Sequence, residues 1–135
     1  MVNFENDYIF GASKENEIFD ILEKKFGKLI KNSRYCKYDF ENERYAIELK
    51  SRKNNYNIYP TTLLTCNKIT NTNKKLYFIF NFTDGIYYIK YREHIFNTFE
   101  KKKYSRINKT YDKKDYYFIP IEYLRPIEYL KKKNY

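Results

Sequence analysis

YCKYDFENERYAIELKSR, residues 35–52, alternates apolar and polar side chains along two short arms joined by a polar turn. Alternation with a period of two is typical of half-buried β-strands. The segment therefore predicts a β-hairpin whose charged side chains share one face. The side chains expected on that face are Lys37, Asp39 and Glu41 from the first arm and Glu48, Lys50 and Arg52 from the second.

The position of the turn decides which side chains of this hairpin face each other. We expect the turn to be centred between Glu43 and Arg44. Asp39 then lies directly opposite Glu48, with Cβ atoms roughly 4.5–5.5 Å apart. Two carboxylates at that distance repel each other unless a cation lies between them. Because carboxylate oxygens suit hard divalent cations, and Lys50 follows on the same face, the hairpin predicts a metal site.

Asp39, followed on the next arm by Glu48-Leu49-Lys50, resembles the motif of the PD-(D/E)xK nuclease superfamily. The resemblance implies an α/β fold of the α+β type: a restriction-endonuclease-like core, in which helices flank a mixed central β-sheet. It also implies a metal-dependent phosphodiesterase that hydrolyses DNA with Mg²⁺, for which Mn²⁺ can substitute. The metal ligands that it implies are Asp39, Glu48 and the carbonyl oxygen of Leu49. Lys50 would orient or deprotonate the attacking water.

A hairpin with one solvated face is the alternative interpretation of the same residues. Antiparallel sheets often expose one face to water, and Asp, Glu and Lys are common there. Cross-strand pairs of opposite charge would then contribute a few tenths of a kcal/mol each. On this interpretation the E-x-K pattern is a feature of the surface, and the rest of the chain has to distinguish the two.

Residues 11–29, GASKENEIFDILEKKFGKL, have the spacing of an amphipathic helix, with Ser13 as the expected N-cap and Gly27 near the expected end. The apolar stripe comprises Ile18, Phe19, Leu22 and Phe26. Glu15 falls within this stripe on a helical wheel, where a carboxylate needs a cationic partner or a metal. The family resemblance implies a first-helix glutamate at the metal site, so Glu15 is a further candidate ligand. Alternatively, Glu15 lies in the first turn and interacts with the helix dipole.

A second helix is expected from Pro60 to about Asn71, because proline suits a first helical turn and Leu63, Leu64, Asn67 and Lys68 follow at helical spacing. The resemblance implies a helix beside the site that offers a basic residue toward it. Lys68 is therefore a candidate phosphate contact. A solvated lysine is the alternative.

Residues 76–91 predict a second β-hairpin, since Asp84-Gly85 between two aromatic runs is typical of a type I′ turn. The unbroken apolar run Leu76–Phe80 indicates a central strand that is covered on both faces. Residues 92–115 are basic and less regular; we expect them to begin as a helix and to continue as a lysine-rich loop. A last strand at Tyr116–Ile119 and a short tail complete the expected elements.

The chain carries 27 lysines and arginines against 17 aspartates and glutamates, a formal net charge of +10. Such an excess indicates a polyanionic partner, because it attracts phosphate backbones and releases their counterions. We expect Arg52, Lys53 and Lys68 to contact DNA. The 17 tyrosines are candidates for stacking on exposed bases. Lysine runs and tyrosines are, however, also ordinary components of solvated faces and cores.

Length and composition limit the remaining possibilities. The 135 residues suit a single domain, residues 1–135, with a real core. Apolar runs are too short for a membrane span, and two isolated cysteines predict neither a zinc site nor a disulfide framework. An intracellular location, cytoplasmic or nuclear, fits this composition. The Asn, Lys, Ile and Tyr bias is typical of an AT-rich genome and, with the family resemblance, is consistent with a large DNA virus or a phage.

Other catalytic patterns are weak in this sequence. His94 is the single histidine, and the three glycines are too scattered for a phosphate-binding loop. We therefore interpret the chain as a Mg²⁺-dependent DNA nuclease, either endonuclease or exonuclease, with a homodimer as one option. The alternatives are a non-catalytic DNA-binding protein, such as an inactive nuclease fold or a virion or packaging component, and a structural protein with an acidic protein partner.

Overall fold

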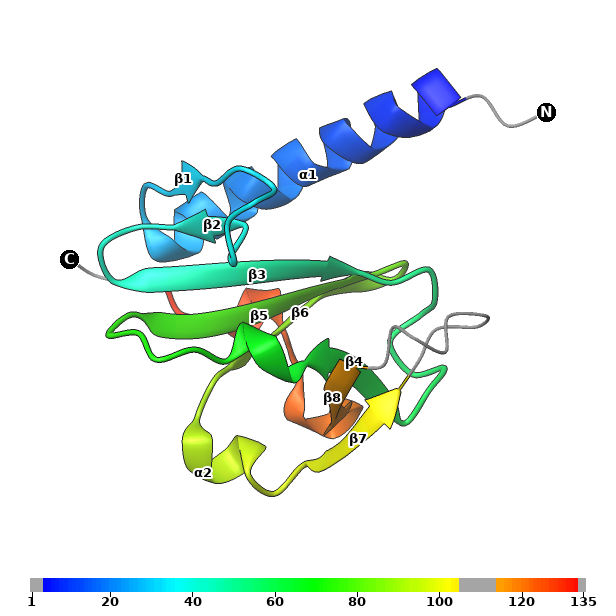
Figure 1. Ribbon diagram of the computed structural model, residues 1–135. Helices are drawn as coiled ribbons and strands as arrows, with labels where there is room; N and C mark the ends of the chain where they lie inside the picture. Colours follow the sequence, from blue (N-terminus) through cyan, green and yellow to red (C-terminus); the bar gives the residue numbers. More distant parts are fainter. Residues whose placement is uncertain (1–3, 105–113, 134–135) are drawn as a thin grey trace. The chain divides into compact units, whose positions relative to one another are not determined.

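The structure is a computed structural model, which describes residues 4–104 and 114–133, with side chains from residue 15 onward (Figure 1). The chain divides into two compact units. The first consists of the N-terminal residues up to Leu29 with the C-terminal residues from Lys131, and the second is Ile30–Leu130. Within the described residues, no helix combines the length and the apolar character that crossing a bilayer requires.

The first unit is built on the helix α1, Phe4–Phe26. It begins well before residue 11, so Ser13 lies inside the helix and its assignment as N-cap is wrong. No proline lies between residues 4 and 13, and the helix tolerates Gly11. The predicted end is confirmed. Gly27 has a φ of 87°, and its N–H donates to the Glu23 carbonyl (2.9 Å), which is the left-handed termination that glycine favours.

The buried stripe of α1 is narrower than the sequence indicated. Ile18, Leu22 and Phe26, spaced four residues apart, are buried, whereas Phe19 is half-buried. Glu15 is exposed, so the prediction of a carboxylate buried in this stripe is wrong. The reason is that the buried surface is a single row of every fourth residue, and Glu15 lies three residues before the first buried member.

The second unit contains a six-stranded mixed sheet, which confirms the predicted combination of helix and mixed sheet (Figure 1). Its strands, in spatial order, are β1 (Ile30–Lys31), β2 (Phe40–Glu41), β3 (Tyr45–Ser51), β5 (Lys75–Phe82), β6 (Gly85–Lys90) and β9 (Arg125–Pro126). β3 and β5 run parallel, and all other neighbours are antiparallel.

β5 is the central strand that the apolar run predicted, with Leu76–Phe80 buried without interruption. The hairpin to β6 is confirmed, but its turn lies one residue earlier than expected. Phe82 pairs with Gly85, so Thr83 and Asp84 form the loop, and Gly85 does not have a positive φ. Both loop residues bond outside the hairpin, since Thr83 N–H donates to Asn54 O and Asp84 Oδ1 accepts the Tyr56 N–H.

A second, three-stranded antiparallel sheet contains β4 (Thr61–Thr65), β8 (Lys114–Pro120) and β7 (Glu100–Tyr104), in that order. The predicted helix from Pro60 is therefore wrong: residues 61–65 form a strand, followed by the 3-10 helix η1, Cys66–Lys68. Three threonines in five residues favour extended backbone, and the alternate burial of Thr62 and Leu64 has the period of a strand.

The predicted lysine-rich loop is also wrong where the structure describes it, because residues 100–104 pair with β8 as an edge strand. Exposed lysines are a common feature of such edges. The rest of that predicted loop, residues 105–113, lies outside the described residues. The strand at Tyr116–Ile119 is confirmed within β8, and the expected start of a helix after residue 92 is the short α2, Glu93–Phe96. Two 3-10 turns, η2 (Ile121–Tyr123) and η3 (Ile127–Tyr129), complete the unit.

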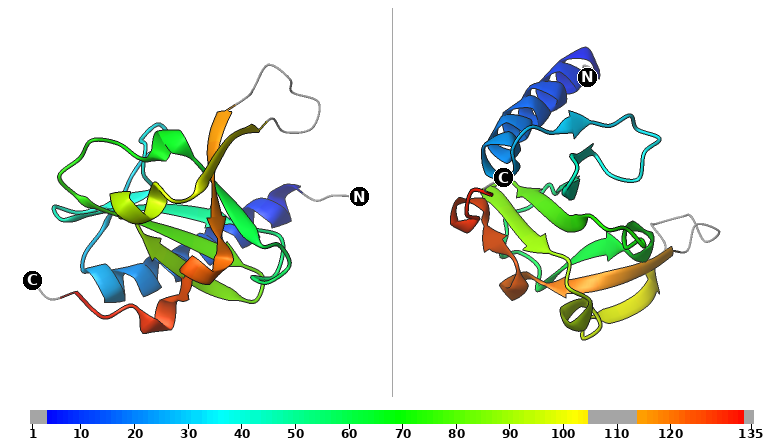
Figure 2. Two further views of the ribbon diagram at one scale, coloured as in Figure 1. Left: turned by 90° about the horizontal axis from the view of Figure 1, so that it is seen from below. Right: turned by 90° about the vertical axis from the view of Figure 1, so that its left-hand side faces the viewer.

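Both sheets, whose strands are seen from two further sides in Figure 2, contribute residues to one hydrophobic cluster. Its members include Phe78 and Phe80 from β5, Leu64 from β4, Ile119 from β8 and Phe96 from α2. Because β3 and β5 are in parallel register, with Glu48 beside Phe78 and Lys50 beside Phe80, the charged face of β3 is the face turned toward the second sheet. This arrangement positions the candidate site between the two sheets.

Candidate functional site

The first hairpin has the predicted register. Phe40 pairs with Ile47 and Glu41 with Ala46, so the turn is centred between Glu43 and Arg44. One step further, the Asp39 N–H donates to the Ile47 carbonyl (3.0 Å), so the ladder slips by one residue and Asp39 does not pair directly with Glu48. The two acidic side chains are nevertheless close, because Asp39 contributes to the raised pKa of Glu48 through a hydrogen bond and through its charge.

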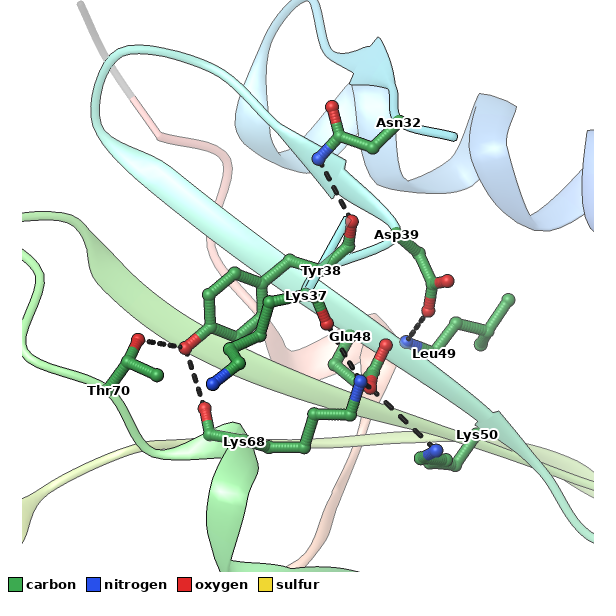
Figure 3. Close-up of polar contacts among 9 residues, drawn as sticks. All are labelled: Asn32, Lys37, Tyr38, Asp39, Glu48, Leu49, Lys50, Lys68 and Thr70. Carbon is green, nitrogen blue, oxygen red and sulfur yellow. Dashed lines mark hydrogen bonds and ion pairs between the residues drawn. The ribbon is translucent and has the colours of Figure 1, made fainter. Parts of the chain in front are cut away.

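Asp39 lies immediately before β2, and its carboxylate forms a hydrogen bond to the backbone of β3. Its Oδ2 accepts the N–H of Leu49 at 2.7 Å (Figure 3). In a strand, the N–H and C=O of one residue point to the same side. The carbonyl of Leu49 is therefore directed to the same edge of β3 as its N–H, the edge at which the Asp39 carboxylate lies. The PD-(D/E)xK resemblance implies a backbone metal ligand at this position.

Glu48 is buried, with 3% of its surface exposed, in the middle of β3. The interpretation of this strand as a hairpin arm with a solvated face is therefore wrong for Glu48, because β3 is paired on both edges and its charged face is turned toward the second sheet. The pKa of Glu48 is raised to about 7, chiefly by burial and then by the neighbouring carboxylate of Asp39, while Lys68 and Lys50 oppose the shift.

Two ammonium groups face this carboxylate. Lys68 Nζ lies 2.5 Å from Glu48 Oε2, and Lys50 Nζ lies 3.7 Å from the same oxygen (Figure 3). Among the described residues, Oε2 nevertheless accepts no hydrogen bond of regular geometry. The negative charge is thus compensated by the two neighbouring ammonium groups, of which Lys68 is the closer.

The position of Lys68 is fixed by a network between the hairpin and the segment after β4. The Tyr38 hydroxyl donates to the Lys68 carbonyl (2.6 Å) and lies 2.7 Å from the Thr70 hydroxyl, and Lys68 Nζ donates to the Lys37 carbonyl (2.8 Å). These contacts join residues about thirty positions apart in the chain. Tyr38 and Thr70 were not among the predicted site residues. The alternating pattern placed Tyr38 on the apolar face, and its hydroxyl partners give no signal in the sequence.

The two remaining predicted DNA contacts have different environments. Arg52 Nε donates to Thr62 Oγ1 (3.1 Å), and its Nη2 donates to the Leu63 carbonyl (2.5 Å), so its guanidinium attaches β4 to the end of β3. Lys53 is exposed. A role for either in binding DNA stays a prediction, as does a role for Glu15, which belongs to the other compact unit.

The donor set can be compared with the requirements of a divalent cation. Among the described residues, no three His, Cys, Asp or Glu side chains lie close enough together to hold a metal ion. Asp39, Glu48 and the Leu49 carbonyl nevertheless offer only oxygen atoms, and a metal ion at Glu48 Oε2 would take the place of the Lys68 ammonium. Mg²⁺ is commonly bound through one or two carboxylates, with water and substrate phosphate completing its shell. The residues present therefore fit Mg²⁺ or Mn²⁺ better than zinc, which prefers nitrogen and sulfur.

In comparisons with protein-family models, with curated proteins and with solved structures, no match to the chain is found.

Proposed function

We propose that the chain is a Mg²⁺-dependent nuclease of the PD-(D/E)xK type, with a restriction-endonuclease-like core, that hydrolyses phosphodiester bonds in DNA. The observation that carries this proposal is the buried Glu48, which faces Asp39 and two lysines in a chain of net charge +10. A carboxylate at 3% exposure destabilises a fold unless it is compensated. Such costly groups are concentrated at functional sites.

Each residue has a distinct task in this mechanism. Asp39, Glu48 and the Leu49 carbonyl would hold Mg²⁺, and the Asp39 carboxylate is already oriented by the Leu49 N–H. The bound cation would supply Lewis acidity and neutralise charge on the scissile phosphate. Lys50, which is one-third exposed and 3.7 Å from Glu48, would orient the attacking water as an ammonium group or, in its neutral amine form, accept the proton of that water. Because the cation would replace Lys68 as the partner of Glu48, the Lys68 ammonium would be able to contact the phosphate.

The decisive experiment compares the parent protein with Lys50→Ala on supercoiled, linear, single-stranded and four-way-junction DNA, with Mg²⁺, Mn²⁺ or EDTA. We expect cleavage that requires the metal and that falls by about 10²–10⁴-fold in the variant, as for loss of an acid–base group. Lys75→Ala is the matched control, because Lys75 is an exposed lysine at the far end of the adjacent strand β5. Equal activity of Lys50→Ala and the parent would contradict the role of Lys50.

The second candidate function is DNA binding without catalysis, and one observation favours it. Lys68 already neutralises Glu48 at 2.5 Å, so the site is electrostatically compensated without a metal. A binding protein of this kind would lose affinity steeply with salt and would be indifferent to Mg²⁺. It would also bind DNA more tightly after Asp39→Ala, which removes a repelling charge. DNA binding by parent and Lys50→Ala without cleavage by either would select this candidate.

A further inference from the structure

A groove begins at Lys50 and follows β4 away from the carboxylates. Its first part, of about 200 Å³, is lined by Lys50, Arg52, Leu63, Thr65, Tyr104 and Tyr116. A second hollow, of about 450 Å³, shares Arg52, Leu63 and Tyr104 with the first and is lined in addition by Tyr56 and Tyr59. Three lining residues are common to both, so the two hollows adjoin and together make up a groove whose first part reaches Lys50 of the candidate site.

The wall of this groove is the outer face of the three-stranded sheet. Tyr117 and Ile119 of β8 are buried, so the alternate residues Tyr116 and Phe118 point outward. Tyr116 pairs with Lys102 of β7, and its ring meets the ring of Tyr104 edge-to-face, with centroids 6.0 Å apart. Tyr104 is 46% exposed. The face therefore presents aromatic rings to solvent where a core would bury them.

The charges around these rings are mostly positive. Lys102 and Lys114 lie on the same face of the sheet as Tyr104, and Lys50 lies at one end of the groove. Lys102 is 5.9 Å from the ring centre of Phe118 and forms an exposed ion pair with Glu100 (2.8 Å). Exposed aromatic rings interleaved with lysines are the combination that binds single-stranded nucleic acids, because the rings stack on bases while the cations follow the backbone.

We infer that this groove binds a single-stranded segment of DNA, with bases stacked on Tyr104 and Tyr116 and the backbone leading to Lys50. A duplex does not offer the faces of its bases to a protein ring, since they are stacked within the helix. The groove therefore selects single strands, or the unpaired arm of a branched substrate. The delivery of a phosphate to Lys50 rests on the proposed function, whereas the stacking needs no cleavage.

The test measures fluorescence anisotropy of a labelled oligothymidylate and of a labelled duplex of equal length, in EDTA so that no cleavage occurs. Base stacking contributes about 1–3 kcal/mol per base, so Tyr104→Ala should weaken single-strand binding by about 5–150-fold. Tyr104→Phe, which keeps the ring, should bind as the parent does, and duplex binding should not change. Tyr129→Ala is the matched control, because Tyr129 is 74% exposed and does not line the groove.

Several outcomes would overturn the inference: normal single-strand binding by Tyr104→Ala, an equal loss for single strand and duplex, or the same loss in Tyr104→Phe. Melting curves of each variant establish that the fold is retained. The inference and the proposed nuclease fail separately. If Tyr104→Ala weakens single-strand binding but no substrate is cleaved in a metal-dependent way, the groove is supported and the nuclease is contradicted. If the parent cleaves DNA but Tyr104→Ala binds single strands as the parent does, the nuclease is supported and the groove is contradicted.

Discussion

Lys68 Nζ lies 2.5 Å from Glu48 Oε2, and this contact joins the 3-10 turn η1 to the strand β3. The carboxylate is buried and the ammonium is partly exposed. Lys68 and a divalent cation would therefore compensate the same negative charge, and the two compete for one oxygen. The charge of Glu48 and its compensation respond to a change of pH, to the addition of a divalent metal and to the removal of Lys68. Each response can be measured separately.

The first prediction concerns pH. Glu48 has its pKa raised to about 7 by burial, so its protonated form favours the folded state. This contribution is complete below pH 4.5, the ordinary value, and is lost as the pH rises through about 7. In EDTA, the unfolding free energy of the parent should fall relative to Glu48→Gln over this window, by about 3 kcal/mol at most. Urea unfolding of both proteins across the window measures the difference, and parallel stability curves would contradict it.

The second prediction concerns the metal. Asp39→Asn keeps an oxygen that can accept the Leu49 N–H but loses the charge, so the hairpin should fold as before. Mg²⁺ should raise the melting temperature of the parent and leave that of Asp39→Asn unchanged. The shift in the parent should also shrink below pH 7, where Glu48 is protonated. Glu41→Gln, which removes a half-buried carboxylate of β2 outside the site, is the control and should respond to Mg²⁺ as the parent does. Equal Mg²⁺ shifts in parent and Asp39→Asn would contradict the metal site.

The third prediction removes the lysine. Lys68→Met leaves a buried carboxylate without its closest cation, which costs roughly 3–5 kcal/mol for a buried pair. Because Glu48 can take up a proton instead, the loss in unfolding free energy should be largest above pH 7 and smaller in acid. Mg²⁺ should restore part of the stability.

The control for this prediction is Lys74→Met. Lys74 forms an ion pair of similar length with Glu41 (2.8 Å), but both side chains are about one-third exposed. Such surface pairs contribute about 1 kcal/mol or less. If both lysine variants lose the same stability, Lys68 does not compensate a buried charge.

Local patterns allowed much of the fold to be predicted from the sequence. The alternation in residues 35–52 gave the correct register, and the apolar run Leu76–Phe80 identified the central strand, because burial leaves a direct trace in residue type. The helix from Pro60 failed since two adjacent leucines fit a helix as well as a strand. Its three threonines and the pairing with β8 decided the outcome, and that pairing partner lies more than fifty residues away.

The candidate site could be predicted only in part, for a related physical reason. Asp39, Glu48 and Lys50 are carried by one hairpin, so their proximity follows from its register. The contact of Lys68 with Glu48 depends on how η1 meets the hairpin, through the Tyr38 hydroxyl and Thr70, and no sequence period encodes it. The burial of Glu48 was likewise invisible, because it results from the second sheet facing β3.

The fourth prediction tests Tyr38 as a positioning residue. Tyr38→Phe keeps the buried ring but removes the bond to the Lys68 carbonyl and the contact with Thr70. One lost hydrogen bond that leaves a buried acceptor costs about 1–3 kcal/mol. The variant should also weaken the coupling between Lys68 and Glu48, measured as the non-additivity of Lys68→Met and Glu48→Gln in both backgrounds. An unchanged coupling energy would mean that Tyr38 contributes only to the packing of the core and does not position Lys68.

The fifth prediction separates the two neighbouring cations Arg52 and Lys53. Arg52 is bonded to Thr62 and to the Leu63 carbonyl, and its guanidinium lies 5.6 Å from the ring centre of Phe80. Arg52→Ala should therefore lower the unfolding free energy by about 1.5–3 kcal/mol, the contribution of a hydrogen bond to a charged group. Lys53 is exposed, so Lys53→Ala should leave stability unchanged and weaken DNA binding, with the salt dependence reduced by about one unit.

Unfolding curves together with DNA titrations over a range of salt concentrations distinguish these two roles. Arg52→Lys adds a further comparison, because it keeps the positive charge but cannot reproduce the two-donor contact with β4. If Arg52 acts by attaching β4 to β3, Arg52→Lys should be destabilised nearly as much as Arg52→Ala while keeping the salt dependence of the parent. A stable Arg52→Lys with weakened DNA binding would instead assign the guanidinium to the phosphate backbone.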